Sequence, residues 1–264
     1  MTEQAHVGAP VLEAETLSIQ FGGLKALQEL SFSIPEKTVF SIIGPNGAGK
    51  TTFFNIVTGI YRPTGGDVRL YGESIVGLEP SRIVERGVCR TFQNIRLFQN
   101  LTVLENVMIG RQLHERTGLG DILLRTQRFR AQEAETLDRA AEILDYVGIL
   151  DDANALAKNL PYGRQRRLEI ARALATAPRL LVLDEPTAGM NPSESEEMVQ
   201  LFQRICEERG VCVLMIEHDM KVVMGVSQRI LVLNFGRQIA LGSPREVLEN
   251  EEVITAYLGH QKVM

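Results

Sequence analysis

Residues 44–51 read Gly-Pro-Asn-Gly-Ala-Gly-Lys-Thr and match the pattern G-x-x-x-x-G-K-[ST]. Four fixed positions at ordinary residue frequencies give roughly 0.01 chance matches in a chain of this length. The apolar run 39–43 precedes the motif and predicts a strand buried on both faces, and a helical segment at 50–58 follows it. A glycine-rich turn between a buried strand and a helix N-terminus is typical of a loop that binds phosphate.

The residue types of this phosphate loop fit contact with a nucleotide. Gly47 and Gly49 allow backbone N–H groups to turn inward around phosphate oxygens, and the helix N-terminus adds a positive dipole end. Lys50 can reach the β- and γ-phosphates as a mobile charge, Thr51 is placed to ligate Mg²⁺, and Thr52 to hold the α-phosphate. The sequence therefore predicts that a nucleoside triphosphate and Mg²⁺ bind at Gly44, Pro45, Asn46, Gly47, Ala48, Gly49, Lys50, Thr51 and Thr52.

A second motif, Leu180-Leu-Val-Leu-Asp184-Glu185, is an apolar run that ends in two carboxylates. It predicts a buried strand with Asp184 at its carboxyl end, where ligands of α/β sheets bind. Asp184 would organise Mg²⁺ and its waters. Glu185 points to the other side of the chain and would polarise a water. Taken alone, the pattern also describes a solvated strand end; beside the phosphate loop it favours a nucleotide site.

Strand-like and helix-like segments alternate along the chain and predict an α/β fold with a parallel sheet wrapped by helices. Strands are predicted at 17–21, 30–34, 39–43, 68–70, 180–183, 211–216 and 230–234, and helices at 50–58, 102–116, 129–147, 163–177, 192–209 and 219–228. Asn191 followed by Pro192 predicts a helix start, and Ser243 with Glu246 has capping-box spacing. The nearly all-helical stretch 95–175 predicts a subdomain inserted into the sheet.

The composition is that of a soluble globular chain, with 44% hydrophobic and 23% charged residues in a length of 264. There are 28 Lys and Arg against 33 Asp and Glu, and the net charge of −5 disfavours a nucleic-acid binder. Cys89, Cys206 and Cys212 lack CxxC spacing, which argues against a zinc site and fits a reducing compartment. No segment predicts a signal peptide or a membrane span, so we expect a cytoplasmic protein that other chains would carry to a membrane.

Further motifs, taken in order, resemble the ATP-binding cassette (ABC) ATPases over nearly the whole chain. The resemblance is closest to the ATP-binding subunits of bacterial branched-chain amino acid ABC transporters. The segments that carry it are Arg90-Thr-Phe-Gln-Asn-Ile-Arg-Leu-Phe, Gly163-x-Gln-Arg-Arg-Leu-Glu-Ile-Ala-Arg-Ala-Leu, Glu185-Pro-Thr-Ala-Gly-Met-Asn-Pro192, Ile216-Glu-His-Asp-Met220 and Val253-Ile-Thr-Ala-Tyr-Leu-Gly259.

The resemblance implies a P-loop NTPase fold of the ABC type, in which a mostly parallel sheet is joined by an N-terminal antiparallel β part and an inserted helical subdomain. It implies a single cassette over 1–264. The expected parts are a RecA-like core with the antiparallel β part (1–94 and 176–240), a helical signature subdomain (95–175) and a C-terminal helical extension (241–264).

The resemblance also implies that two cassettes face each other head to tail. Each ATP would lie between one chain's phosphate loop and the other chain's signature segment 160–164, which includes Tyr162, Gly163 and Arg164. Asn191 would lie in the loop that crosses this interface.

The same resemblance assigns the catalytic roles. Glu185 would be the general base, His218 would hold the γ-phosphate, and Phe21 would stack on adenine. Gln93 would sense Mg²⁺ and the attacking water, as a further ligand of the metal site of Thr51 and Asp184, and relay that state to a membrane subunit.

Several of these residues have simpler explanations. Phe21 alternates with Leu17 and Ile19 and would also fit a core position, and His218 would also fit an ordinary surface site. The arginines at 164, 166, 167 and 172 would fit a solvated helix face, and only Arg164 is expected at the interface. The apolar residues within 95–101 would fit either a contact with a membrane subunit or the core of the helical subdomain.

The signature segment departs from the family's common Leu-Ser-Gly-Gly-Gln. Pro161 replaces the Ser, Tyr162 the first Gly and Arg164 the Gln. Proline has neither a hydroxyl nor a backbone N–H, so two possible donors to a γ-phosphate are absent.

The expected function is ATP hydrolysis that powers a membrane importer of branched-chain or other amino acids. The expected partners are a second cassette, two permease subunits and an external substrate-binding protein, with no nucleic acid, at the cytoplasmic face of the membrane. Two alternatives remain open. One is the ATPase of a lipid or lipopolysaccharide exporter, and the other is a soluble clamp protein that acts on ribosomes or DNA.

Overall fold

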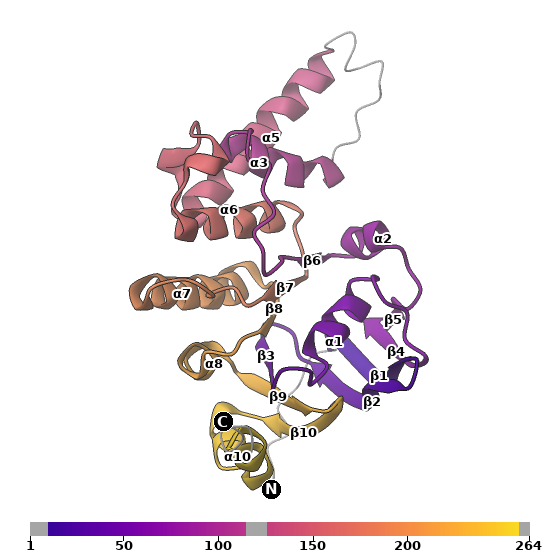
Figure 1. The fold of residues 1–264 in the computed structure, drawn as a ribbon. Helices are drawn as coiled ribbons and strands as arrows, with labels where there is room; N and C mark the ends of the chain where they lie inside the picture. Colours follow the sequence, from indigo (N-terminus) through magenta and orange to yellow (C-terminus); the bar gives the residue numbers. More distant parts are fainter. Residues whose placement is uncertain (1–9, 115–125, 259–264) are drawn as a thin grey trace, which may run out of the picture. The chain divides into compact units, whose positions relative to one another are not determined.

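The computed structural model describes residues 10–114 and 126–258, which form two compact units (Figure 1). The first unit comprises the chain up to Arg90 and again from Arg179, and the second comprises Thr91–Pro178. The second unit is a continuous insertion into the chain of the first, and it contains the stretch 95–175 that the sequence predicts as a helical subdomain. Strands and helices alternate, and the α/β fold class is confirmed. Among the described residues, no helix is long and apolar enough to cross a membrane.

The first unit contains a six-stranded sheet in the order β10-β9-β3-β8-β7-β6 (Figure 1). Its strands are β3 (Val39–Ile43), β6 (Val88–Arg90), β7 (Leu180–Asp184), β8 (Cys212–Ile216), β9 (Arg229–Asn234) and β10 (Arg237–Gly242). Neighbouring strands are parallel except for β9 and β10, which form an antiparallel hairpin. Every residue of β3, β7 and β8 is buried, as their apolar runs predicted. The carboxyl ends of the parallel strands share one edge, and this edge carries the phosphate loop and Asp184.

The N-terminal strands form a separate antiparallel sheet in the order β2-β1-β4-β5. Its strands are β1 (Leu12–Phe21), β2 (Leu24–Ile34), β4 (Gly65–Leu70) and β5 (Glu73–Ser74). Leu17 and Ile19 are buried, as the alternating pattern of a half-buried strand predicted. Phe21, the last residue of β1, departs from that pattern because it is exposed. Helix α1 (Lys50–Val57) follows the phosphate loop, and its Phe53 and Phe54 belong to a core that contains residues of both sheets.

The remaining helices of the first unit are α2 (Pro80–Glu85), α7 (Pro192–Arg209), α8 (Met220–Val226), α9 (Pro244–Leu248) and α10 (Glu251–Leu258). Asn191 and Ser243 cap α7 and α9 through capping boxes, which confirms both predicted helix starts. Strand β10 was not predicted from the sequence, and it ends at Gly242, just inside the expected C-terminal extension. The turn that creates its hairpin contains Gly236, at φ 77°.

The second unit is built from α3 (Val103–Arg111), α5 (Gln127–Tyr146) and α6 (Tyr162–Ala175), with short 3₁₀ turns at Gln112–His114, Leu150–Asp152 and Ala157–Asn159. All three predicted helices are present with shifted ends, and the end of the predicted helix 102–116 lies outside the described residues. Gly110 allows α3 to approach α6 closely, because a Cβ there would lie 2.4 Å from the Arg172 carbonyl oxygen. Buried Val107, Leu144 and Leu168 supply one side chain from each helix to the apolar interior.

Candidate nucleotide-binding site

The phosphate loop is shaped by glycines that no other residue could replace without strain. Gly44 and Gly49 have φ of 150° and 102°, and added Cβ atoms would lie 2.1 Å from the Leu233 carbonyl oxygen and 2.6 Å from that of Ala26. Gly47 has φ 80°, and a Cβ added there would meet no described atom within 4 Å, so it would face open space. The loop is therefore held from behind by its neighbours and remains open in front, where a phosphate would bind.

Lys50 lies across this loop. Its Nζ donates hydrogen bonds to the carbonyl oxygens of Gly44 (2.6 Å) and Pro45 (2.9 Å). Burial lowers the pKa of the Lys50 ammonium, and the negative charges of Glu185 and Asp184 act in the opposite direction. The ammonium is thus partly desolvated and held by weak, neutral acceptors, which an anionic phosphate would replace with stronger ones.

A cavity of about 620 Å³ opens in front of the phosphate loop. Residues 46–52 line it together with Phe21, Leu24, Glu185 and Phe235. Phe21 is 43% exposed and packs edge-to-face on Tyr61, with ring centroids 5.2 Å apart, so the alternative that places Phe21 in the core is wrong. The cavity combines apolar side chains with a polar loop, which suits a nucleotide that has an apolar base and charged phosphates.

Asp184 ends β7 and is paired with Arg90 at the end of β6. The distance from Arg90 Nη2 to Asp184 Oδ2 is 2.8 Å, and the two side chains are only 7% and 12% exposed. Arg90 Nη1 also donates to Asn55 Oδ1 of α1 at 2.7 Å. Arg90 therefore fixes the Asp184 carboxylate against the helix that begins in the phosphate loop. The sequence assigned Arg90 no role of its own, because its partner lies 94 residues further along the chain.

Glu185 follows directly in a left-handed conformation, with φ 48°. Its backbone N–H donates to the Ile216 carbonyl oxygen at 2.9 Å, which ties the end of β7 to the end of β8. His218 Nδ1 lies 3.7 Å from Glu185 Oε1, and the His218 side chain is 67% exposed. His218 is a surface residue, as its simpler explanation required, and it also lies beside the predicted general base.

Glu217, between β8 and His218, is a buried carboxylate that was not predicted to have a role. It accepts hydrogen bonds from the Thr187 backbone N–H (2.9 Å) and hydroxyl (2.6 Å), and from the backbone N–H of His218 (3.1 Å). It thereby connects the segment after Glu185 to the segment that carries His218. The signal in the sequence was present, since an apolar strand precedes Glu217 as another precedes Asp184.

The donor set of this edge fits ATP with Mg²⁺. The Thr51 side chain is exposed at the first turn of α1, and Thr52 is half-buried beside it. Hydroxyl and carboxylate oxygens such as those of Thr51 and Asp184 are ligands that Mg²⁺ prefers, and in nucleotide sites phosphates and waters complete its shell. When bound, Mg²⁺ would neutralise charge on the phosphates.

Two predicted site residues of the second unit, Gln93 and Tyr162, share a contact with Arg166, which donates to the Gln93 carbonyl oxygen and the Tyr162 hydroxyl. Gln93, Tyr162 and Arg164 are exposed, and Gly163 is half-buried in the first turn of α6. Arg164 forms an ion pair with Asp152 of the same unit. Pro161 is the residue that precedes the helix, and it makes no side-chain capping bond.

The solvated-face explanation of the α6 arginines is wrong for Arg166. Arg166 is fully buried and pairs with the buried Glu169, because these side chains lie one helical turn apart on the inner face. Arg167 donates to the Val147 carbonyl oxygen at 2.8 Å, and the Arg172 guanidinium lies over the Phe98 ring. The arginines at 166, 167 and 172 thus take part in the internal contacts of the second unit.

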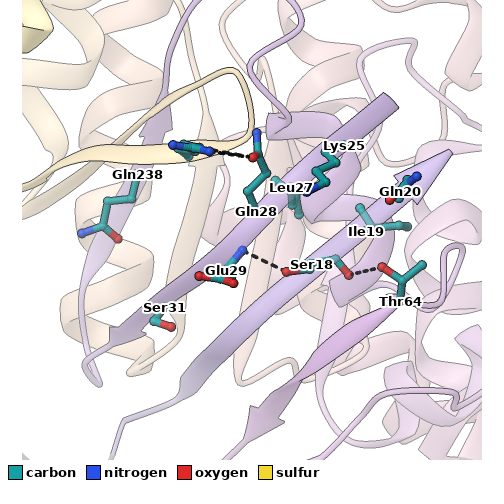
Figure 2. A pocket seen from close by; sticks show the side chains of 11 residues that line it. Ser18, Ile19, Gln20, Lys25, Leu27, Gln28, Glu29, Ser31, Thr64 and Gln238 are labelled. Atoms are coloured by element: carbon teal, nitrogen blue, oxygen red, sulfur yellow. Dashed lines mark hydrogen bonds between the residues drawn. The ribbon is translucent and has the colours of Figure 1, made fainter. Parts of the chain in front are cut away.

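A second cavity, of about 570 Å³, lies beside β1, β2 and β10 (Figure 2). Some of its lining residues hydrogen-bond to one another: Ser18 Oγ accepts from the Glu29 backbone N–H, and Arg237 donates to Gln28 Oε1. The described residues that line it include no predicted site residue, so the predicted nucleotide site belongs to the cavity at the phosphate loop.

The chain matches two family models. Residues 27–188 match a family described as ABC transporter, and residues 237–263 match one described as branched-chain amino acid ATP-binding cassette transporter. The chain is 48% identical to the high-affinity branched-chain amino acid transport ATP-binding proteins LivG of Salmonella typhimurium and BraF of Pseudomonas aeruginosa. Each match covers 95% of this chain and 98% of the relative.

Solved structures share the fold. The ADP conformation of an ATP-binding cassette of an ABC transporter matches with a TM-score of 0.83 and 30% identity, over 96% of this chain and 100% of that chain. A dimeric structure of a bacterial ABC transporter cassette matches with a TM-score of 0.74 and 27% identity, over 89% of this chain and 99% of that chain.

Proposed function

This chain belongs to the family of ABC transporter ATP-binding proteins, and from that membership we propose that it hydrolyses ATP to power an importer of branched-chain amino acids. The observation that carries the proposal is the 48% identity, over nearly the full length of both chains, with proteins named for that transport. These relatives lend no support to the lipid-export alternative.

Phosphoryl transfer depends mainly on positioning and charge stabilisation, and the residues of the first unit supply both. Lys50 and the amides of the phosphate loop would bind the phosphates, and Thr51 with Asp184 would hold Mg²⁺, which would neutralise charge on those phosphates. Glu185 accepts the proton of the attacking water, while His218 beside it contacts the γ-phosphate. Arg90 keeps the Asp184 carboxylate in place through their ion pair. Glu217 joins the segment after Glu185 to the segment of His218.

The working unit is a pair of cassettes bound to two permease subunits at the cytoplasmic face of the membrane. An external substrate-binding protein delivers the substrate to the permeases. A dimer is supported by the dimeric cassette structure that this fold matches. Each partner would present Tyr162, Gly163 and Arg164 to the other's ATP, and Gln93 would report the state of that site to the permease. The segment 95–101, whose Phe98 is 48% exposed, would contact the permease.

Glu185→Gln tests the chemistry. Without its general base, hydrolysis should fall roughly 10²- to 10⁴-fold, while ATP binding persists because Lys50, Thr51 and Asp184 remain. The exposed Glu196→Gln removes the same charge from α7 and should leave turnover unchanged. Steady-state ATPase assays and equilibrium nucleotide titration measure the two effects, and near wild-type turnover in Glu185→Gln would place the base elsewhere.

Co-purification tests the transport context. An importer ATPase should co-purify with integral membrane permeases when the tagged chain is extracted in mild detergent from its native membrane. Recovery with lipid-export subunits would support the exporter alternative, and recovery with ribosomes would support the soluble clamp.

A further inference from the structure

Helix α6 of the second unit carries a buried ion pair. Arg166 Nη1 lies 2.7 Å from Glu169 Oε2, and the side chains are 0% and 1% exposed. Arg166 Nη2 also donates to the Tyr162 hydroxyl at 3.2 Å. A buried pair of this kind persists only when further hydrogen bonds satisfy both groups, so its other partners indicate what it holds.

Those partners are backbone groups of the segment 92–96. Arg166 donates to the carbonyl oxygens of Phe92 (2.8 Å) and Gln93 (2.9 Å). Glu169 Oε1 accepts from the backbone N–H groups of Phe92 and Arg96, at 3.4 Å each. The pair therefore binds both donors and acceptors of one short segment from a single helix, and Gln93 keeps an exposed side chain.

We propose that Arg166 and Glu169 are positioning residues that fix the Gln93 segment to the helix of the signature segment, so that the two move as one body. This inference rests on the proposed ATPase function for its kinetic consequence. The two bonds from Arg166 have the length of charge-assisted hydrogen bonds, and together with the two longer bonds to Glu169 they leave the segment little independent motion. Movement of α6 would then be transmitted directly to the backbone of Gln93.

Glu169→Gln tests the proposal in the full-length chain. Glu142→Gln is a matched control, because Arg139 and Glu142 form an ion pair of the same spacing at 2.9 Å on α5 that is more than half exposed. Hydrogen–deuterium exchange of peptides covering 92–96 should accelerate about tenfold or more in Glu169→Gln and remain unchanged in Glu142→Gln. Exchange in the phosphate loop should be the same in all three proteins.

The kinetic readout separates positioning from general damage. A displaced Gln93 should lower kcat about 10- to 100-fold, because small misplacements of groups near a reaction are that costly. The KM for ATP should stay within about twofold, since the phosphate loop belongs to the other unit. The proposal would be overturned if kcat of Glu169→Gln fell only in proportion to its folded fraction while hydrogen–deuterium exchange at 92–96 stayed at the wild-type rate.

A second variant keeps the test decisive if the unpaired charge prevents folding. Arg166→Met with Glu169→Leu replaces the pair by apolar side chains, a change that buried ion pairs often tolerate. The double variant should fold and still show fast exchange at 92–96. Wild-type exchange there in the folded double variant would refute the proposal. A wild-type chain without ATPase activity would instead contradict the proposed function, while the exchange comparison would still decide this inference.

Discussion

Lys50 shows how a single residue prepares the site for its ligand. Its ammonium is bound to two carbonyl oxygens of its own loop, and burial already lowers its pKa. Burial disfavours the charged state compared with solution, and the two neutral carbonyl acceptors offset this only in part; a triphosphate would supply stronger, anionic acceptors. Binding energy is therefore available from this side chain without rearrangement of the fold.

Lys50→Ala should weaken ATP binding roughly 10- to 100-fold, the equivalent of a lost charge-assisted hydrogen bond of about 1.5–3 kcal/mol. The free energy of unfolding should change by less than about 1 kcal/mol, because alanine favours the first turn of α1. Nucleotide titration and chemical denaturation measure the two quantities, with Lys221→Ala on α8 as the charge control. Unchanged affinity in a folded Lys50→Ala protein would contradict the role of the loop.

The roles of residues such as Lys50 were predictable from the sequence because they depend on residues close by in the chain. The spacing within 44–51 defines the phosphate loop by itself. Arg90 was not predictable, because it acquires its role only when β6 and β7 lie side by side. The apolar strand before Glu217 signals a strand end, but the contact of Glu217 with Thr187 depends on β7 and β8 lying side by side. Arg166 was misread for a related reason, since a charged residue on a helix indicates solvent unless its buried partner is known.

At the scale of elements, the hairpin of β9 and β10 supports the phosphate loop. The backbone N–H of Gly236 donates to the Ala48 carbonyl oxygen at 3.0 Å, and the Gln28 backbone N–H donates to the Gly236 carbonyl oxygen at 2.8 Å. Gly236 has φ 77°, and an added Cβ would lie 2.5 Å from the Ala26 carbonyl oxygen. The turn, the start of β2 and the phosphate loop are therefore packed backbone against backbone.

Gly236→Ala should destabilise the fold by roughly 1–3 kcal/mol and weaken ATP binding, because the turn must shift away from Ala26 and takes the phosphate loop with it. Gly72→Ala is the control, since Gly72 has φ 78° but no described atom lies within 4 Å of an added Cβ. It should show the backbone strain without the loss of affinity. Equal effects of both substitutions on nucleotide titration would contradict the support of the loop by the hairpin.

The start of α6 gives a second element-level prediction. Pro161 provides no side-chain acceptor for the first turn, and Pro161→Ser would add one, worth about 1 kcal/mol. Loss of the proline ring makes the unfolded chain more flexible and so destabilises the fold by about 0.4–1 kcal/mol. The two effects nearly cancel, and the free energy of unfolding should hardly change. ATP-driven pairing should tighten by about tenfold or less, measured by size-exclusion chromatography on a Glu185→Gln background. A change in the monomer's nucleotide affinity without one in pairing would contradict the head-to-tail arrangement.

Most elements were predictable because their periodicity is local. The apolar runs of β3, β7 and β8 and the cap of α7 at Asn191 lie where the sequence indicates them. The short α2 and β6 were not predicted, since three to six residues carry little periodic signal. Strand β10 was missed because its pairing with β9 depends on a two-residue turn, and β10 has only one buried residue, Gly242.

At the scale of the whole molecule, buried groups that ionise at alkaline pH make the free energy of unfolding depend on pH. Burial raises the pKa of Cys206 to about 11 and that of Cys212 to about 12, from a usual value of 9.0. Burial also raises the pKa of Tyr257, beside the backbone of Gly44, to about 12. In each case the folded chain retains a proton that the unfolded chain loses at lower pH.

The free energy of unfolding should therefore begin to fall near pH 8, where the thiols of the unfolded chain start to ionise, and should continue to fall as the pH rises toward 11. Between pH 8 and 10 each unfolded thiol ionises while its folded counterpart does not, so the two buried cysteines together cost about 3 kcal/mol. Denaturant titrations across this pH range measure the decline. The double variant Cys206→Ala with Cys212→Ala should be less stable at neutral pH, because it leaves cavities, yet its stability should depend much less on pH in this window. An equally steep decline in the double variant would show that other groups, and not these thiols, ionise on unfolding.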